Sequence, residues 1–267
     1  MSSADRQKKF RLDVRCPSNL LIMSNSAEET QTIASKNPIS IQSENSIDLL
    51  EENENKNKFE KWRKSLMYIT GLGLSDKEKA EYKIELEKTL SNYQHRKCEK
   101  WRDDLMKKSA IVVFMLKNLE EAGCKPDKKH FKCLPCDNTR SGGFSPDHGI
   151  MLCQNRFSSK RHVEDTMVHE MIHLYDHCRF KVNWSSCHHH ACSEVRAAAL
   201  SGDCKWTREI KRGFFNFTKQ HQACAKRRAI LSVKKNASCS APGVAERVVA
   251  EVFESCFNDT RPFDEIY

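Results

Sequence analysis

The cysteines limit how this chain can fold more than any other feature of its sequence. Of the 13 cysteines, only Cys16 lies before Cys98, and the others are scattered from there to Cys256. A content this high is typical of metal sites or of an oxidising compartment. The motif Cys133-Leu134-Pro135-Cys136 has no second C-x-x-C with which to complete a zinc ribbon. The scatter therefore favours disulfides, whose pairing the spacing leaves open, with at least one unpaired thiol because the number is odd.

The N-terminal part of the chain differs in composition from the rest. Residues 17–57 are polar, rich in Ser, Asn and Glu, and contain no aromatic residue, which is typical of disorder. We predict a disordered extension over residues 1–57 and one folded domain over residues 58–267. The N-terminus has no apolar core with a cleavage site and includes acids such as Asp5, so it predicts neither a secretory signal nor a transit peptide. No apolar run reaches the roughly 18 residues that predict a membrane span.

Helices dominate the predicted domain. A short helix ended by the glycines is expected within residues 59–74, and a capping box of the S-x-x-E type opens the next helix at Ser75. A long helical stretch ends at Gly123, and helical patterns resume near Ser159 and continue almost to the C-terminus. Residues 124–157 between them are rich in turn residues and contain two short predicted strands. The sequence thus predicts a mainly α protein with a small β element, of the α+β class.

One predicted helix carries a motif with recognisable chemistry, His169-Glu170-Met171-Ile172-His173, which is H-E-x-x-H. Positions i and i+4 lie on one face of a helix, one turn apart, so both imidazoles can bind one Zn²⁺. Glu170 lies about 100° around the helix from His169, where it can hydrogen-bond a metal-bound water. It then serves as general base in peptide hydrolysis and passes the proton to the leaving amine. Apolar neighbours indicate a buried helix, as in a zincin-like metallopeptidase domain; the alternative is a helix with histidines on a solvated face.

A catalytic zinc ion needs a third protein ligand and one open position. Glu194 is the first candidate, because it lies 21 residues after His173 on a second predicted helix, a spacing similar to that in thermolysin-like enzymes. Asp176 is the rival candidate, because it projects from the same helix face as His173. His177 continues the four-residue row but needs a strained reach to the same ion. A salt bridge to a base such as Arg196 is the alternative role for Glu194.

The run His188-His189-His190 contains three further imidazoles. Adjacent side chains on a helix or a turn point in different directions, so they do not converge on one ion. A role at the edge of a site or on the surface is therefore favoured over metal ligation.

The chain is basic, with a formal charge of +9 and a pI near 8.9. This balance suits an anionic partner such as lipid, nucleic acid or an acidic protein, or it belongs to a soluble basic protein without such a partner. The sequence contains no dense Lys/Arg cluster and no recognisable reading helix, so nucleic acid is not an expected partner.

From about Phe59 to the C-terminus, the chain resembles the mitochondrial ATP-synthase-assembly metalloproteases of the inner membrane. The matching segments occur in order and extend over about 209 of the 267 residues. They are FEKWRKSLMYITGLGL, CEKWRDDLMKKSAIVVFML, CLPCDNTRSGGF, GIMLCQNR, HEMIHLYDHCR, HHHACSEVRAAALSGDC and EVFESCFND.

The resemblance implies a zinc metallopeptidase that removes the presequence of the mitochondrially encoded ATP synthase subunit 6 and separately assists assembly of the Fo sector. It implies that His169 and His173 are zinc ligands and that Glu170 is catalytic. It also implies peripheral attachment to the inner membrane on the intermembrane-space side, where the cysteines are oxidised. The implied partners are a precursor or unfolded polypeptide substrate and a prohibitin-type membrane scaffold.

An assembly chaperone of ATP synthase, with a mainly structural zinc site, is the alternative function. In some members of the family that the chain resembles, proteolysis is not needed for the assembly role. An intact H-E-x-x-H motif is therefore compatible with either function.

Overall fold

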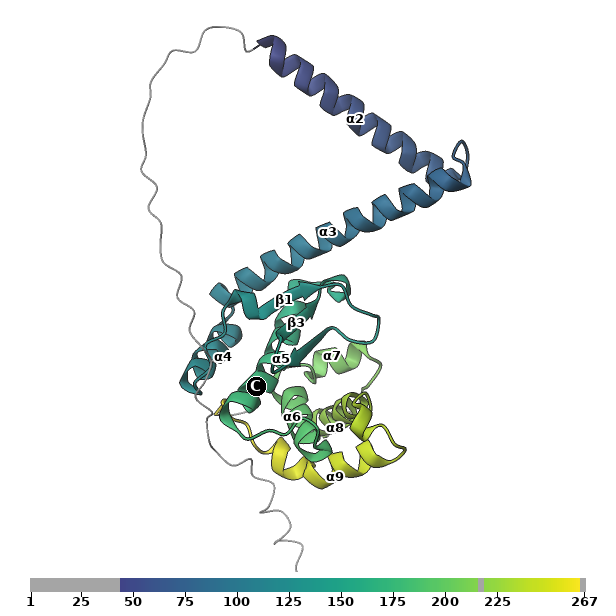
Figure 1. Ribbon diagram of the computed structural model, residues 1–267. Coiled ribbons are helices and arrows are strands. Elements are labelled where there is room, and N and C mark those ends of the chain that lie inside the picture. The colour runs from purple at the N-terminus through teal and green to yellow at the C-terminus, as the bar shows by residue number, and fades with distance from the viewer. Residues whose placement is uncertain (1–43, 216–218, 265–267) are drawn as a thin grey trace, which may run out of the picture. The chain divides into compact units, whose positions relative to one another are not determined.

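The computed structural model describes residues 44–215 and 219–264, which fall into two compact units, residues 44–90 and residues 91–264 (Figure 1). The smaller unit contains helix α2 (Glu44–Thr70) and the first part of helix α3 (Asp76–Lys108). The rest of α3 belongs to the larger unit. Within the described ranges, no helix combines the length and the apolar character needed to cross a membrane.

Helix α2 begins earlier than the sequence predicts. It starts at Glu44, inside the segment expected to be a disordered extension, and ends before Gly71, whose positive φ of 72° a residue with a side chain rarely adopts. The proposed boundary near residue 58 falls inside this helix and stays a prediction, and residues 1–43 lie outside the described chain. The predicted capping box at the start of α3 is confirmed, since the backbone N–H of Ser75 donates to Glu78 at 2.8 Å.

The long helical stretch predicted to end at Gly123 is two helices. Ser109 leaves the helical conformation and caps α4 (Ala110–Glu121), because its hydroxyl accepts a hydrogen bond from the backbone N–H of Val112. The same hydroxyl donates to Glu164 at 2.6 Å. This contact with a residue distant in the sequence fixes the break, so periodicity alone did not reveal it.

A three-stranded sheet replaces the two strands predicted from the sequence. The strands β1 (Phe131–Leu134), β2 (Gly142–Ser145) and β3 (Gly149–Cys153) have the order β1-β3-β2, with β1 parallel and β2 antiparallel to β3. The expected pair of strands corresponds to β2 and β3. Strand β1 was missed because it is only four residues long and runs into the C-x-x-C turn. As an edge strand, β2 has one side without a partner strand in this sheet.

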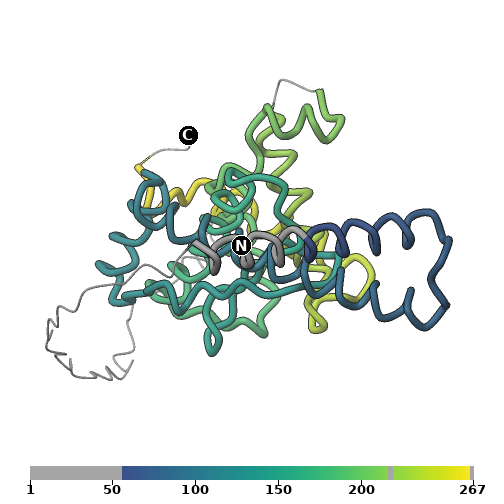
Figure 2. Tube along the Cα trace, turned by 90° about the horizontal axis from the view of Figure 1, so that it is seen from above, coloured from purple at the N-terminus to yellow at the C-terminus, as the bar shows by residue number. Residues whose placement is uncertain are grey.

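Five helices complete the larger unit: α5 (Lys160–Arg179), α6 (Cys187–Leu200), α7 (Trp206–Lys211), α8 (Gln220–Val233) and α9 (Val244–Phe257). Helix α5 packs against β2 and β3, and α6 packs against α5, α8 and α9 (Figure 1). The buried side chains of α6 include Ala191 and residues 197–199, all alanine, whose small size lets three helices approach. In the view from above, α7 and the start of α8 project from the edge of this unit (Figure 2).

Six disulfides cross-link the larger unit, which confirms that the scattered cysteines form disulfides. They join elements that are distant in the sequence, and each loop closed in this way is expected to stabilise the fold by about 3 kcal/mol. Cys16 lies outside the described residues. The pairs are Cys98–Cys133, Cys124–Cys178, Cys136–Cys153, Cys187–Cys239, Cys192–Cys256 and Cys204–Cys224.

Candidate metal centre

Helix α5 presents the two histidines of the H-E-x-x-H motif. Its first turn is capped by Ser159, whose hydroxyl accepts a hydrogen bond from the backbone N–H of His162 at 3.2 Å. Met167 and Met171 are fully buried on its core side. His169 and His173 lie one turn apart on another side, with their ring centroids separated by 5.0 Å.

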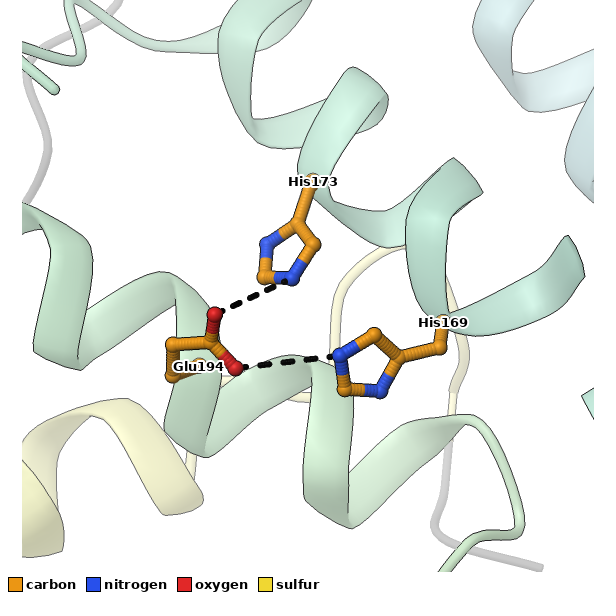
Figure 3. A group of neighbouring side chains, drawn as sticks. All are labelled: His169, His173 and Glu194. Atoms are coloured by element: carbon orange, nitrogen blue, oxygen red, sulfur yellow. Dashed lines mark ion pairs between the residues drawn. The ribbon is translucent and has the colours of Figure 1, made fainter. Parts of the chain in front are cut away.

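Helix α6 brings Glu194 to the same point. The carboxylate Oε2 lies 3.7 Å from Nε2 of His169, and Oε1 lies 3.6 Å from Nε2 of His173 (Figure 3). One ligand atom from each of the three side chains lies within 4.8 Å of the others. His173 and Glu194 are buried and His169 is partly buried. The three side chains therefore converge from two packed helices.

A chain of hydrogen bonds fixes the protonation of the His173 ring. Its Nδ1 lies 2.7 Å from the hydroxyl of Ser193, which lies 2.8 Å from Oδ2 of Asp176. Because a carboxylate only accepts, Ser193 donates to Asp176 and accepts from Nδ1–H of His173. Burial lowers the pKa of His173 to about 3, so the ring is neutral. Its Nε2 therefore carries a lone pair, directed at Glu194.

Two side chains hold the carboxylate of Glu194. Its Oε1 accepts from the Ser232 hydroxyl at 2.6 Å and lies 3.2 Å from Nε2 of His190. The amide oxygen of Asn236 accepts from the backbone N–H of Ser238, so its amide nitrogen is the group 3.0 Å from Nδ1 of His190. Nδ1 of His190 then accepts a hydrogen bond, and Nε2–H donates to Glu194.

This arrangement leaves two acceptors face to face, the lone pair of His173 Nε2 and an oxygen of Glu194. Zn–N and Zn–O distances of about 2.0–2.2 Å put two ligand atoms of one tetrahedral zinc ion about 3.3–3.6 Å apart. The observed separations of 3.6 and 3.7 Å are close to that value. Two imidazoles and one carboxylate are also a donor set that zinc uses in catalytic sites. The residues present therefore fit a zinc ion.

The charges around His169 favour a cation at the same place. Burial alone lowers the pKa of His169, but the nearby Glu194 carboxylate and the negative charge of Glu170 raise it to about 9. Burial also opposes the charge on Glu194, yet the surrounding histidines hold its pKa well below the usual range. The two carboxylates thus create a negative potential where the imidazoles converge.

Glu170 lies beside the three converging side chains and under strand β2. Burial raises its pKa to about 7, against the opposing effect of His169. A Cβ atom added at Gly142 of β2 would lie 3.0 Å from Oε1 of Glu170 and 2.7 Å from Cγ2 of Thr166. Only a glycine lets the strand pass this close to the carboxylate.

These residues open onto a cavity of about 870 Å³. Strand β2 lines it with Gly142, Gly143 and Phe144, so the free edge of the sheet borders the site. This volume is in the upper part of the range of about 300–1,000 Å³ that small-ligand pockets span. The lining also includes ion-paired arginines, of which Arg212 and Arg228 both contact Asp203.

The structure separates the two candidates for the third ligand. Asp176 is fully buried and accepts from Ser193 and from Nε of Arg196 at 3.0 Å, away from the converging ligand atoms. Arg196 is therefore the partner of Asp176, and the ion pair considered for Glu194 with this arginine is not formed. Glu194 faces both histidines.

The remaining histidines have different surroundings. Nδ1 of His177 lies 3.4 Å from the indole N–H of Trp184, and His177 is not part of the converging group. His188 contacts Glu251 at 2.8 Å. His190 reaches the site, at its edge, as expected for a member of the histidine run.

Sequence reasoning missed the residues that orient the ligands. Ser193, Ser232 and Asn236 are ordinary polar residues, and no spacing rule connects them with the motif. The only available signals were that Ser193 adjoins Glu194 and that His190 precedes it by one helical turn.

Comparisons with known proteins agree with this geometry. The sequence model described as the Peptidase M76 family matches residues 96–264. The chain is 46% identical over 219 residues to the mitochondrial inner membrane protease ATP23 of Vanderwaltozyma polyspora, covering 77% of this chain and 87% of the relative. It is 45% identical over 221 residues to the protein of the same name from Kluyveromyces lactis, covering 78% and 90%. The relative from Malassezia globosa is 50% identical over 188 residues, covering 63% and 76%. No solved structure matches the chain.

Proposed function

The chain belongs to the peptidase M76 family and is a peptidase, and we propose that it is a zinc-dependent endopeptidase attached peripherally to the mitochondrial inner membrane. The observation that carries the zinc proposal is the convergence of His169, His173 and Glu194 on one point, with two acceptors facing each other there. In this proposal the three side chains are the zinc ligands and Glu170 is the catalytic residue.

Glu170 is the group that moves protons in the proposed reaction. Zinc bound at this centre would polarise the scissile carbonyl and make a water molecule more acidic. The Glu170 carboxylate takes a proton from the attacking water and delivers it to the amine nitrogen as the C–N bond breaks. Ser193 and Asp176 keep Nε2 of His173 available for the metal, and His190 and Ser232 orient Glu194.

The substrate class is a polypeptide, because the relatives are named as proteases. The free edge of β2 offers backbone groups to which an extended peptide can hydrogen-bond beside Glu170. On the basis of the family resemblance of the sequence, we propose the presequence of ATP synthase subunit 6 as the substrate and a prohibitin-type scaffold as a membrane partner. Six disulfides support an oxidising location, such as the intermembrane space.

The proposed function is tested with purified, disulfide-intact protein. We expect about one zinc ion per chain by elemental analysis and cleavage of a peptide that spans the subunit 6 presequence junction. A chelator is expected to abolish cleavage, and added Zn²⁺ is expected to restore it. Cleavage that persists in metal-free protein would contradict the zinc proposal.

Replacing Gly142 by Ala is expected to lower kcat/KM by about tenfold or more at unchanged zinc content. The added methyl group meets the Glu170 carboxylate and Thr166, so the proton-transfer group is displaced. The matched control is Gly143→Ala, whose Cβ meets only Cε of Met151 at 3.7 Å, an ordinary contact. Steady-state kinetics of the two variants test this. Equal losses of kcat/KM in both would show that the loss comes from a disturbance of strand β2 in general and not from its close approach to Glu170.

Replacing His190 by Ala is expected to weaken zinc binding by about 10–100-fold, because Glu194 loses one of its two orienting donors. Competition with a chromophoric chelator measures this affinity without requiring activity. His189→Ala is the matched control, since His189 accepts from the backbone N–H of Asn183 and, within the described part of the chain, makes no hydrogen bond or ion pair with Glu194. Unchanged affinity in His190→Ala would remove His190 from the metal centre.

A further inference from the structure

The smaller unit exposes an apolar stripe that the peptidase site does not use. On α2, Phe59, Trp62, Leu66 and Ile69 are 58%, 58%, 45% and 77% exposed. With about 100° between successive helical residues, their directions fall within an arc of about 80°. These four residues, called here the α2 stripe, therefore form one continuous apolar surface along the helix.

Positive charge accompanies the α2 stripe. Around the helix, Lys58 comes next to one edge of the stripe and Arg63 next to the other, while Lys61 and Lys64 lie behind it. Glu60 is the single acid between residues 56 and 70, and it contacts Arg63 at 3.0 Å. The basic residues between 56 and 70 are Lys56, Lys58, Lys61, Arg63 and Lys64.

Helix α3 provides an internal contrast. Its Leu86 and Leu90 are also about half exposed, at 48% and 52%. Both signs of charge accompany them, with Glu85 and Glu87 alongside Lys83 and Lys88. Exposed apolar surface thus occurs on both helices of the unit, but only in residues 56–70 of α2 is it combined with more cations than acids, five against one.

We propose that the α2 stripe docks the protein on an anionic lipid surface. Trp and Phe bury their rings in the headgroup region, and Lys58 and Arg63, which flank the stripe, meet lipid phosphates, as in helices that lie in the membrane interface. A second copy of the chain is a poorer occupant, because it would bring two sets of cations together. The inference deepens the proposed function, since it names the element behind the proposed inner-membrane attachment.

The test is co-sedimentation of the full-length protein with phosphatidylcholine vesicles, with and without cardiolipin. We expect binding to the cardiolipin vesicles that weakens in high salt and is much weaker with phosphatidylcholine alone. The double variant Trp62→Ser/Leu66→Ser is expected to lose about tenfold or more in vesicle affinity. Circular dichroism checks that the helices are retained.

The matched control is Leu86→Ser/Leu90→Ser, which removes two exposed apolar side chains at the same i, i+4 spacing and is expected to keep its affinity. Equal loss in both double variants, or no loss in the α2 variant, would overturn the proposal. The proposal would also be overturned if the wild type is a dimer that does not bind vesicles and the α2 double variant is a monomer. Cleavage of a soluble peptide, measured in parallel, separates failure of docking from failure of the peptidase proposal.

Discussion

Replacing Glu170 by Gln is expected to lower peptidase activity by about 10²–10⁴-fold. The amide has nearly the shape of the carboxylate and fits under Gly142, but it cannot accept the proton from water. Zinc content is expected to stay the same, because Glu170 is not one of the three converging ligands. Since burial raises the pKa of Glu170 to about 7, a neutral amide there is expected to leave thermal stability unchanged or slightly higher.

Kinetics with a presequence peptide, zinc analysis and thermal unfolding check these expectations together. Activity close to that of the wild type would contradict the assigned role of Glu170. The variant also separates the two functions considered for this chain. If cells that carry only Glu170→Gln still assemble ATP synthase while the presequence remains uncleaved, assembly is a separate chaperone role. Loss of assembly in these cells would exclude chaperoning as the principal role.

The sequence predicts that His169, His173 and Glu194 lie close together because this depends on local geometry, and the structure brings them together; their role as metal ligands stays a prediction. One helical turn separates His169 from His173, and Glu194 lies on the next helix after a short connection. The sequence around the motif cannot decide between Glu194 and Asp176, because the sequence spacing of each residue allows it to reach the histidines. It depends on Arg196, which draws Asp176 away from the metal centre, and Arg196 is held by backbone from the C-terminal end of the chain.

The misses have a common physical origin in contacts between distant residues. The helix break at Ser109 is fixed by Glu164, and the orientation of His190 is fixed by Asn236. Disulfide partners likewise become neighbours only in the folded chain. Pattern rules use a window of about one element, so they predicted the α+β class and the helix that carries the motif, but not these contacts.

Replacing Arg196 by Met is expected to destabilise the larger unit by about 3–5 kcal/mol. The arginine is fully buried, donates to Asp176 at 3.0 Å and pairs with Oδ1 of Asp259 at 2.7 Å. Its guanidinium also donates to the backbone carbonyls of Asp259 and Arg261. Methionine fills similar space but leaves a buried carboxylate without its countercharge and two carbonyls without this donor.

Urea unfolding with the disulfides intact measures this loss, and Lys125→Met, which removes a solvent-exposed ion pair with Glu120, is expected to change little. The double variant Arg196→Met/Asp176→Asn removes the uncompensated charge and is expected to recover part of the stability. Its zinc affinity is expected to be lower than that of the wild type, because an amide at residue 176 can donate to Ser193 and disturb the hydrogen bond that keeps Nε2 of His173 free. Recovered stability with lowered zinc affinity would separate the two roles of Asp176, as the counterion of Arg196 and as the residue that orients His173. Recovered stability with the zinc affinity of the wild type would mean that Asp176 serves only to balance the arginine.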